Sequence, residues 1–462
     1  MTDSALTETF DDQALPTYVL SDDVIASVER AVQDDQDDEI RRILAGLGFH
    51  DAAELISKTR SDVRTRLVGH HFNSIDPYVF TDLAPDLRKE TLEALYPEQV
   101  ASILSALESD DALDIISDLD PVFQQEIIRK LNASTRVVLE EGLSFPEDSA
   151  GRLMQREFVA VPEFWTVGKT IDYLREAGDN LPTDFFDVFV IDPTYHVKGE
   201  IPLNRLIRSK RTEKIASLTL DDTHMIPATM DQEEVAHIFQ REDISSAPVI
   251  DDAGRLIGVI TVDDVIDVIN EEAQEDILKL AGVQDSDMYT AVLSSTFSRF
   301  RWLFINLLTA ILASIVISFF DATIQELVAL AVLMPIVASM GGNAGTQAMT
   351  VAVRALATRE LSGANAYRII WKETLIGMLN GFAFAVIIGV LAGLWYHNPI
   401  LGGVIASAMI INLLVAGASG AAIPIILHKI GSDPAISSAV VLTTVTDVVG
   451  FFAFLGLAAL LL

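Results

Sequence analysis

The sequence predicts a multidomain membrane protein in which acidic soluble domains precede five membrane spans. The 462 residues include 66 acidic and 32 basic ones, and the formal net charge is −34. From residue 301 onward acidic and basic residues number six each, so residues 1–300 hold 60 and 26 and carry the whole excess. The neutral C-terminal part contains apolar stretches of the roughly 20 residues that cross a bilayer. Two internal repeats divide the acidic part into domains.

The charge excludes nucleic acid as a partner, because phosphate binding requires Lys and Arg. It favours cations instead, although acidity can also serve solubility alone. The chain has no cysteine, which excludes disulfides and thiolate metal sites. The opening residues MTDSALTETFDDQ are acidic and lack an apolar stretch, so we expect no signal peptide. We expect residues 1–25 to form a disordered acidic lead-in.

Residues 26–150 are predicted to form an α-helical superhelical domain. One leucine recurs every 12 residues, at Leu83, Leu95, Leu107, Leu119, Leu131 and Leu143. A period of this length accommodates a short helix and a turn, and such small units bury an apolar face only by stacking. Chance spacing in a leucine-rich helical domain is the alternative, and it would also leave the domain all-α.

A second repeat covers 151–270. FVIDPTYHVKGEIPLNRLI (189–207) aligns without gaps on PVIDDAGRLIGVITVDDVI (248–266), and each copy is typical of strand, turn, strand and helix after a preceding helix. The pair resembles tandem α/β CBS domains, here 151–211 and 212–270. The resemblance implies a nucleotide site in the second copy, where Thr261 and Asp264 are candidates for binding ATP. The first copy has Pro202 and Arg205 where the family pattern has a hydroxyl and an acid.

An acidic connecting helix is predicted over 271–298, followed by a membrane domain over 299–462. Length and scarcity of charge predict five spans, at about 302–320, 325–351, 370–395, 400–427 and 437–461. The Lys and Arg residues near the span ends fall on one side if the N-terminus is cytoplasmic. The C-terminus is then outside, and we expect a multi-pass protein of the cytoplasmic (inner) membrane.

Asp447 is the main candidate for chemistry inside the bilayer. It lies well inside the fifth span, and a charge at the bilayer centre costs at least about 2.5–3.5 kcal/mol. No basic residue in that span neutralises it, so its natural counter-ion is a transported cation. Thr443 and Ala439 share its helix face and would leave room for a hydrated ion. A protonated carboxyl or a helix-to-helix hydrogen bond is the alternative.

The segment GGNAGTQ (341–347) in the second span is the neutral counterpart. We expect Pro335 and the glycines to loosen this helix and free carbonyl oxygens, which is tolerated where backbone lines a water-filled cavity. Carbonyls and the amides of Asn343 and Gln347 are hard oxygen donors that suit Mg²⁺. The alternative is a glycine-rich helix crossing with buried amides.

The order of these domains is similar to that of the MgtE family of magnesium channels. MPIVASMGGNAGTQ, VRALATREL and SDPAISSAVVLTTVTDVVG resemble its hallmark segments. The resemblance implies a homodimer with the ion path between subunits, and Asp447 as the carboxylate that holds Mg²⁺ through water. It also implies a pore wall or filter that includes Asn343 and its glycines, Gly341, Gly342 and Gly345. Gln347, Ala439 and Thr443 are further candidates, from the donor and helix-face arguments above.

The same resemblance implies that cytoplasmic Mg²⁺ bridges the acidic domains and closes the pore. Candidate regulatory positions are Asp110, Asp114, Gly151, Asp243, Asp264, Asp267, Glu275 and Asp276. Many of these acids could instead form solvated surface. Like charges would hold the domains apart when Mg²⁺ is low, and bound Mg²⁺ would draw them together. Asp264 is thus a candidate for ATP, for Mg²⁺ or for both.

The sequence therefore predicts a Mg²⁺-selective channel that is closed by internal Mg²⁺. No Walker motif is present, so we expect a channel rather than an enzyme. Two alternatives stay open, which are a Mg²⁺ transporter coupled to Na⁺ or H⁺ and a nucleotide-sensing membrane regulator.

Overall fold

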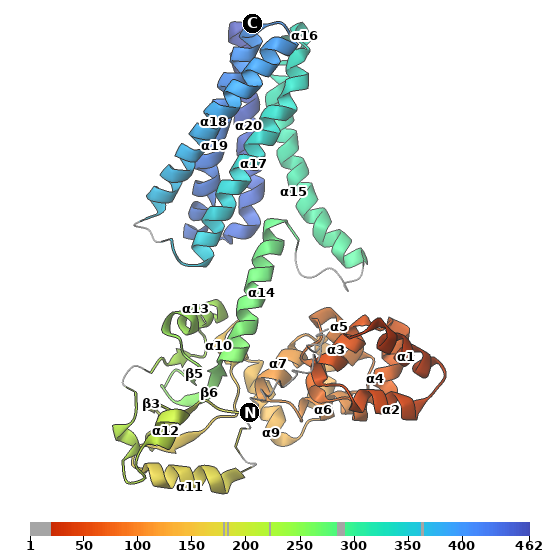
Figure 1. Ribbon diagram of the computed structural model, residues 1–462, viewed down its shortest axis with the longest axis vertical. Helices are drawn as coiled ribbons and strands as arrows, with labels where there is room; N and C mark the ends of the chain where they lie inside the picture. The colour runs from red at the N-terminus through yellow and green to blue at the C-terminus, as the bar shows by residue number, and fades with distance from the viewer. Residues whose placement is uncertain (1–19, 179–180, 183, 221–222, 284–291, 362–364) are drawn as a thin grey trace, which may run out of the picture. The chain divides into compact units, whose positions relative to one another are not determined.

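The computed structural model describes residues 20–178, 181–182, 184–220, 223–283, 292–361 and 365–462 (Figure 1). The chain divides into two compact units, Met1–Glu271 and Glu272–Leu462, and each is described by itself. Most of the predicted lead-in lies outside the described residues. Its expected end at residue 25 was wrong, because helix α1 begins at Asp22.

The helical domain opens unit 1, and its repeat is confirmed. The repeat helices are α5 (Pro85–Glu93), α6 (Pro97–Leu104), α7 (Ser109–Ser117), α8 (Pro121–Ile128) and α9 (Ala133–Gly142), and they begin at a constant step of 12 residues. Each repeating leucine either is buried in one shared core or packs against it. Proline suits the first helical position because its fixed φ is helical and its missing N–H would have no partner there. The preceding elements are α1 (Asp22–Gln33), α2 (Asp37–Ala45), α3 (Phe49–Lys58), α4 (Ser61–His71), η1 (Phe72–Ser74) and η2 (Pro77–Phe80).

Two three-stranded sheets of identical topology follow, after the short helix α10 (Ala150–Leu153). The first module contains β1 (Ala160–Pro162), α11 (Val167–Ala177), β2 (Asp187–Ile191), β3 (Val197–Pro202), α12 (Leu203–Arg208) and η4 (Ile215–Ser217). The second contains β4 (Ile226–Pro227), α13 (Gln232–Glu242), β5 (Ser246–Ile250) and β6 (Leu256–Thr261). In each module the first strand pair is parallel and the second antiparallel. The predicted internal repeat is confirmed.

The repeat also extends to the contact between the modules. Val190 pairs with Gly199 in the first sheet, and the equivalent Val249 pairs with Gly258 in the second. Asp187 and Ser246 are equivalent residues, since they begin β2 and β5. They are in contact across the two modules, where the Ser246 Oγ donates a hydrogen bond to Asp187 Oδ2 at 2.7 Å. The two modules are therefore related by an approximate two-fold arrangement.

The connecting helix differs from its predicted bounds. Helix α14 (Val262–Leu280) begins inside the second module and continues without a break past residue 271. Part of the expected range, 284–291, lies outside the described residues, and the helix that begins at Val292 is already the first span. The acidic segment 271–280 is thus a continuation of the last helix of the second module.

Unit 2 contains five helices that are long and apolar enough to span a membrane, among its described residues. These are α15 (Val292–Ser318), α17 (Ala329–Ala357), α18 (Ala366–Trp395), α19 (Pro399–Lys429) and α20 (Pro434–Leu461), with the short α16 (Asp321–Glu326) after the first. The five predicted spans are confirmed. Helix α19 packs against α17, α18 and α20. Glycines allow this close approach, and a Cβ on Gly417 would lie 2.4 Å from the Glu373 carbonyl oxygen.

Candidate functional site

Asp447 lies in the interior of α20, in the last candidate span. Its side chain is half-buried, and no described residue shares a hydrogen bond or an ion pair with its carboxyl group. Thr443, one turn earlier, is exposed and donates its hydroxyl to the Ala439 carbonyl at 2.9 Å. Leu442 and Thr446 are buried, so they carry the packing of α20 within its own bundle. On the face that Asp447 shares with Thr443 and Ala439, Thr443 is thus exposed and Asp447 half-buried, whereas Ala439 packs against the cluster of Met349, Val353 and Leu442.

The GGNAGTQ segment forms uninterrupted α-helix within α17, although Pro335 lies inside the same helix. The expectation of a loosened backbone with free carbonyls was therefore wrong for this segment. Gly341 is buried, and a Cβ there would lie 2.3 Å from the Asn412 Nδ2. Gly345 is buried, and a Cβ there would lie 2.8 Å from the Leu442 Cδ1 of α20. These two glycines serve helix packing, which is the alternative weighed for this stretch.

Asn412 on α19 is a residue that the sequence reasoning missed. Its side chain is fully buried and donates a hydrogen bond from Nδ2 to the Val337 carbonyl at 2.8 Å. Gly341 and Gly450 flank the carboxamide from α17 and α20, and a Cβ on either would approach it within 3 Å. Its Oδ1 has no hydrogen-bond partner among the described residues. The sequence signal for Asn412 was an amide side chain between two apolar stretches of the fourth span.

The polar side chains of GGNAGTQ lie on a different face from the two packed glycines. Asn343 and Gln347 are exposed, and the Asn343 Nδ2 is 3.4 Å from the Ser339 Oγ. Gly342 has open space around it within the chain. Neither amide shares a hydrogen bond with Asp447 among the described residues. A role for Asn343, Gln347 and Gly342 in a pore stays a prediction.

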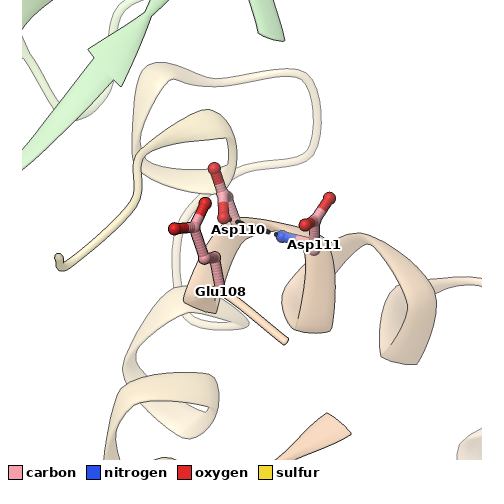
Figure 2. Close-up of side chains that lie close together, drawn as sticks. All are labelled: Glu108, Asp110 and Asp111. Atoms are coloured by element: carbon pink, nitrogen blue, oxygen red, sulfur yellow. Dashed lines mark hydrogen bonds between the residues drawn. The ribbon is translucent and has the colours of Figure 1, made fainter. Parts of the chain in front are cut away.

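A second candidate site lies in unit 1, at the first residues of α7 (Figure 2). Ligand atoms of Glu108, Asp110 and Asp111 lie within 4.8 Å of one another, as a metal site requires. Only Asp110 was predicted. The sequence signal for the other two was present in ESDD, but a search for acids one helical turn apart selected Asp114 instead. The positive end of the α7 dipole also favours anionic groups at this position.

Further carboxylates from the second CBS module face this acidic cluster of Glu108, Asp110 and Asp111. Burial raises the pKa of Asp264 to about 7, and the nearby charges of Asp263 and Asp111 add to the effect. Burial likewise raises the pKa of Asp111 to about 6, with a contribution from Glu108. Burial and the charge of Asp264 raise the pKa of Asp110 well above its usual value. Like charges therefore meet where the helical domain contacts the second module.

Asp264 has a structural partner as well as acidic neighbours. The Thr261 hydroxyl donates a hydrogen bond to its Oδ2 at 2.7 Å. The two candidates for binding ATP are thus hydrogen-bonded to each other. In this arrangement Asp264 faces acids of the helical domain, whose charge would oppose a phosphate.

Asp114 and Asp267 have different surroundings. The Arg88 guanidinium lies 2.8 Å from Asp114 and also binds Asp118, so Asp114 already has a cationic partner. Burial raises the pKa of Asp267, and the charges of Asp263, Asp82 and Asp114 raise it further. Asp267 thus extends the zone of like charge along the same contact.

The remaining predicted positions are dispersed. Gly151 is buried in α10, where its N–H donates to the Ala228 carbonyl at 2.8 Å and a Cβ would overlap the Phe145 ring. Asp243 ends α13 with a left-handed backbone at φ 52°. Glu275 and Asp276 lie on α14 in unit 2, and Glu275 pairs with Lys279 at 2.6 Å. Lys279 also pairs with Asp433 at 3.1 Å, directly before α20.

Comparison with known proteins identifies the family. The divalent cation transporter model of MgtE matches 334–457, the MgtE intracellular N domain matches 47–148, and the CBS domain matches 215–271. The magnesium transporter MgtE of Thermus thermophilus is 31% identical over 462 residues, which cover 96% of this chain and 99% of that protein. The magnesium transporter MgtE of Bacillus subtilis is 28% identical over 442 residues, which cover 95% and 97%.

Among solved structures, the cytosolic domain of the Mg²⁺ channel MgtE in complex with ATP is 29% identical and covers 53% of this chain and 99% of that chain, with a TM-score of 0.49. The soluble part of a magnesium transporter is 25% identical and covers 54% and 98%, with a TM-score of 0.46. The family models and the full-length relatives agree in domain order with the two units described above. The chain belongs to the MgtE family of divalent cation transporters.

Proposed function

We propose that this chain is a Mg²⁺ channel of the cytoplasmic membrane that acts as a homodimer and admits Mg²⁺ to the cell. The observation that carries the proposal is Asp447, a carboxyl inside a span with no hydrogen bond or ion pair to any described residue. Intramembrane acids face a cavity, a partner or an ion. The relatives named as magnesium transporters support Mg²⁺ as that ion.

The donor chemistry supports a hard, hydrated cation. Asp447 and Thr443 share one face of α20, and the segment on α17 contributes the exposed amides of Asn343 and Gln347. The oxygens of these groups are ligands that Mg²⁺ prefers, and one carboxylate per subunit would hold a hydrated ion weakly enough to release it. An inside-negative potential of 100 mV supplies about 4.6 kcal/mol to each divalent ion, so uptake needs no coupled reaction.

Closure by internal Mg²⁺ is the regulatory part of the proposal. The acidic cluster at the start of α7 faces Asp263 and Asp264 across the contact between helical domain and second module. Mg²⁺ in this contact would neutralise repulsion that otherwise opposes it, and so would favour the contacted state. Helix α14 begins with Asp263 and Asp264 in its first turn, and its last residue, Leu280, packs against Met349 and Leu442 of the membrane bundle.

The test is Mg²⁺ flux into proteoliposomes that contain the full chain. Asp447→Asn keeps the side-chain size and removes the charge, and we expect flux to fall at least about tenfold. Asp321→Asn removes an exposed charge on α16 and should leave flux unchanged. Undiminished flux in Asp447→Asn would refute the assignment of the pore.

The two alternatives make different predictions in the same system. A transporter coupled to Na⁺ or H⁺ loses flux when the counter-ion gradient is removed, whereas a channel gives unitary currents without one. A nucleotide-sensing regulator gives ATP-dependent partner binding and no flux. Current recording against stepped Mg²⁺ on the cytoplasmic side separates the channel from both alternatives and also tests closure.

A further inference from the structure

A cavity of about 540 Å³ in unit 1 opens between the two CBS modules. The first module contributes β2, β3 and α12, and the second contributes the turn between α13 and β5, from Asp243 to Ser246. Its size is within the range of cavities that hold small organic molecules. The cavity is separate from the acidic cluster at α7 and shares no lining residue with it.

Two buried carboxyl groups line this cavity. Glu200 is 7% exposed and Asp187 is 8% exposed. Asp187 accepts the hydrogen bond from the Ser246 hydroxyl, whereas the Glu200 carboxyl has no hydrogen-bond or ion-pair partner among the described residues. Burial, together with the charge of Asp187, raises the pKa of Glu200 to about 7. A buried carboxylate without a partner is costly, so this position favours a bound positive group.

The rest of the wall is largely apolar. The lining includes Phe185 and Phe186, and Leu203 and Ile207 of α12 contribute aliphatic surface. Phe186 is 47% exposed and Ile207 is 65% exposed, so apolar area is available to a ligand at the mouth. Aromatic faces also attract organic cations.

We propose that this cleft binds an organic cation, with an amine or guanidinium group against Glu200 and Asp187 and a short apolar body against the aromatic wall. A nucleotide fits poorly, because the described lining contains three carboxylates, the third being Asp243, and no Lys, Arg or His. Phosphate groups would meet like charge there instead of the Arg or Lys partners they require. Pro202 also lines the cleft and offers no hydroxyl for a ribose.

Mg²⁺ alone would leave most of this surface unused. A hydrated ion binds oxygen donors such as the carboxylates, and it makes no use of the apolar part of the wall. An organic cation satisfies the carboxyl groups and the apolar surface together. Because both modules contribute to the wall, such a ligand would stabilise their pairing by binding only the folded arrangement.

Isothermal titration of the full chain in detergent at pH 8 tests this proposal. The probes are agmatine and benzamidine, which carry a cationic head on an aliphatic and an aromatic body, with ATP and MgCl₂ each titrated alone for comparison. We expect at least one of the two cations to bind. Glu200→Gln should weaken that binding at least about tenfold, and Asp187→Asn should weaken it as well. Glu126→Gln, an exposed glutamate on α8, should leave it unchanged.

Three outcomes would overturn the proposal. The first is that neither cation binds the unaltered chain. The second is binding of equal strength in Glu200→Gln and Glu126→Gln. The third is that ATP or Mg²⁺, rather than the organic cations, shows the dependence on Glu200 and Asp187. The thermal unfolding midpoint of each variant, measured without ligand, shows that lost binding is not lost folding.

Discussion

Replacing Gly341 by alanine should damage the membrane bundle, whereas the same change at the neighbouring Gly342 should not. The added methyl at 341 would lie 2.3 Å from the Asn412 Nδ2 and 2.8 Å from its Cγ, against an ordinary contact of 3.4–4 Å. The carboxamide has nowhere to move, since Gly450 flanks it from α20 and its Nδ2 is bonded to the Val337 carbonyl. At Gly342 no atom lies within 4 Å.

The magnitude follows from three contributions. Overpacking a dense core costs about 1–3 kcal/mol, and losing an interhelical hydrogen bond in a membrane costs about 0.6 kcal/mol, rising to about 1.7. Alanine is favoured over glycine inside a helix by up to about 1 kcal/mol. We therefore expect Gly341→Ala to be about 1–3 kcal/mol less stable than the parent chain, and Gly342→Ala to be equal or slightly more stable.

The assay is thermal unfolding of the full chain in detergent, combined with a double-mutant cycle. Asn412→Ala alone loses the hydrogen bond and leaves a small void, so it should be destabilising. In Gly341→Ala/Asn412→Ala the new methyl enters that void, and the pair should be more stable than the sum of the single effects implies. Equal unfolding midpoints for the two glycine variants, or no rescue by Asn412→Ala, would refute the packing role of Gly341.

Three further predictions concern unit 1. Glu200→Gln should raise the unfolding free energy by about 3 kcal/mol at pH 8 and by little at pH 4. The reason is that a carboxyl with a pKa raised to about 7 destabilises the fold only at a pH where it would ionise in the unfolded chain. Unfolding midpoints measured against pH test this, and a gain that does not depend on pH contradicts it. Asp264→Asn should reduce the stabilisation of the chain by Mg²⁺. In the parent chain that stabilisation should weaken from pH 8 to pH 6, because protons compete with Mg²⁺ for Asp264 and Asp111. Thermal unfolding with and without MgCl₂ measures both effects, and an unchanged Mg²⁺ effect in the variant argues against a site at Asp264. Arg88→Ala should lower the unfolding free energy by about 3–5 kcal/mol, because Arg88 is 3% exposed and its loss leaves the Asp118 carboxyl without its cationic partner. The exposed Arg42→Ala is the control, and equal unfolding midpoints would contradict the prediction.

The sequence predicted the repeats accurately because each repeat is a local signal. The 12-residue step of Leu83 to Leu143 reappears as the step between helix starts, since one leucine per unit must reach the shared core. The 59-residue offset between the modules reappears in the strand register, where the pair Val190–Gly199 is equivalent to the pair Val249–Gly258. Span number and type followed from length and hydropathy alone.

Contacts between distant segments could not be predicted in the same way. A glycine in a membrane helix can either loosen the backbone or admit a neighbour, and the choice at Gly341 depends on Asn412, a residue of another helix. Glu108 and Asp111 were missed because spacing along α7 selects acids one turn apart, whereas this cluster forms around the start of the helix. The approach of Asp264 to Asp110 requires the tertiary fold.

The acidic contact in unit 1 has an electrostatic consequence that bears on the proposed closure. Burial and like charge raise the pKa of Asp110, Asp111 and Asp264, so bringing these groups together costs free energy when they are ionised. Either protons or a divalent cation removes that cost, and the cation does so while the carboxyl groups stay ionised. Asp264 lies in the first turn of α14, whereas Lys279 in its last turn pairs with Asp433 beside α20. Helix α14 contains residues of both units, so the proposed closure would act through this helix.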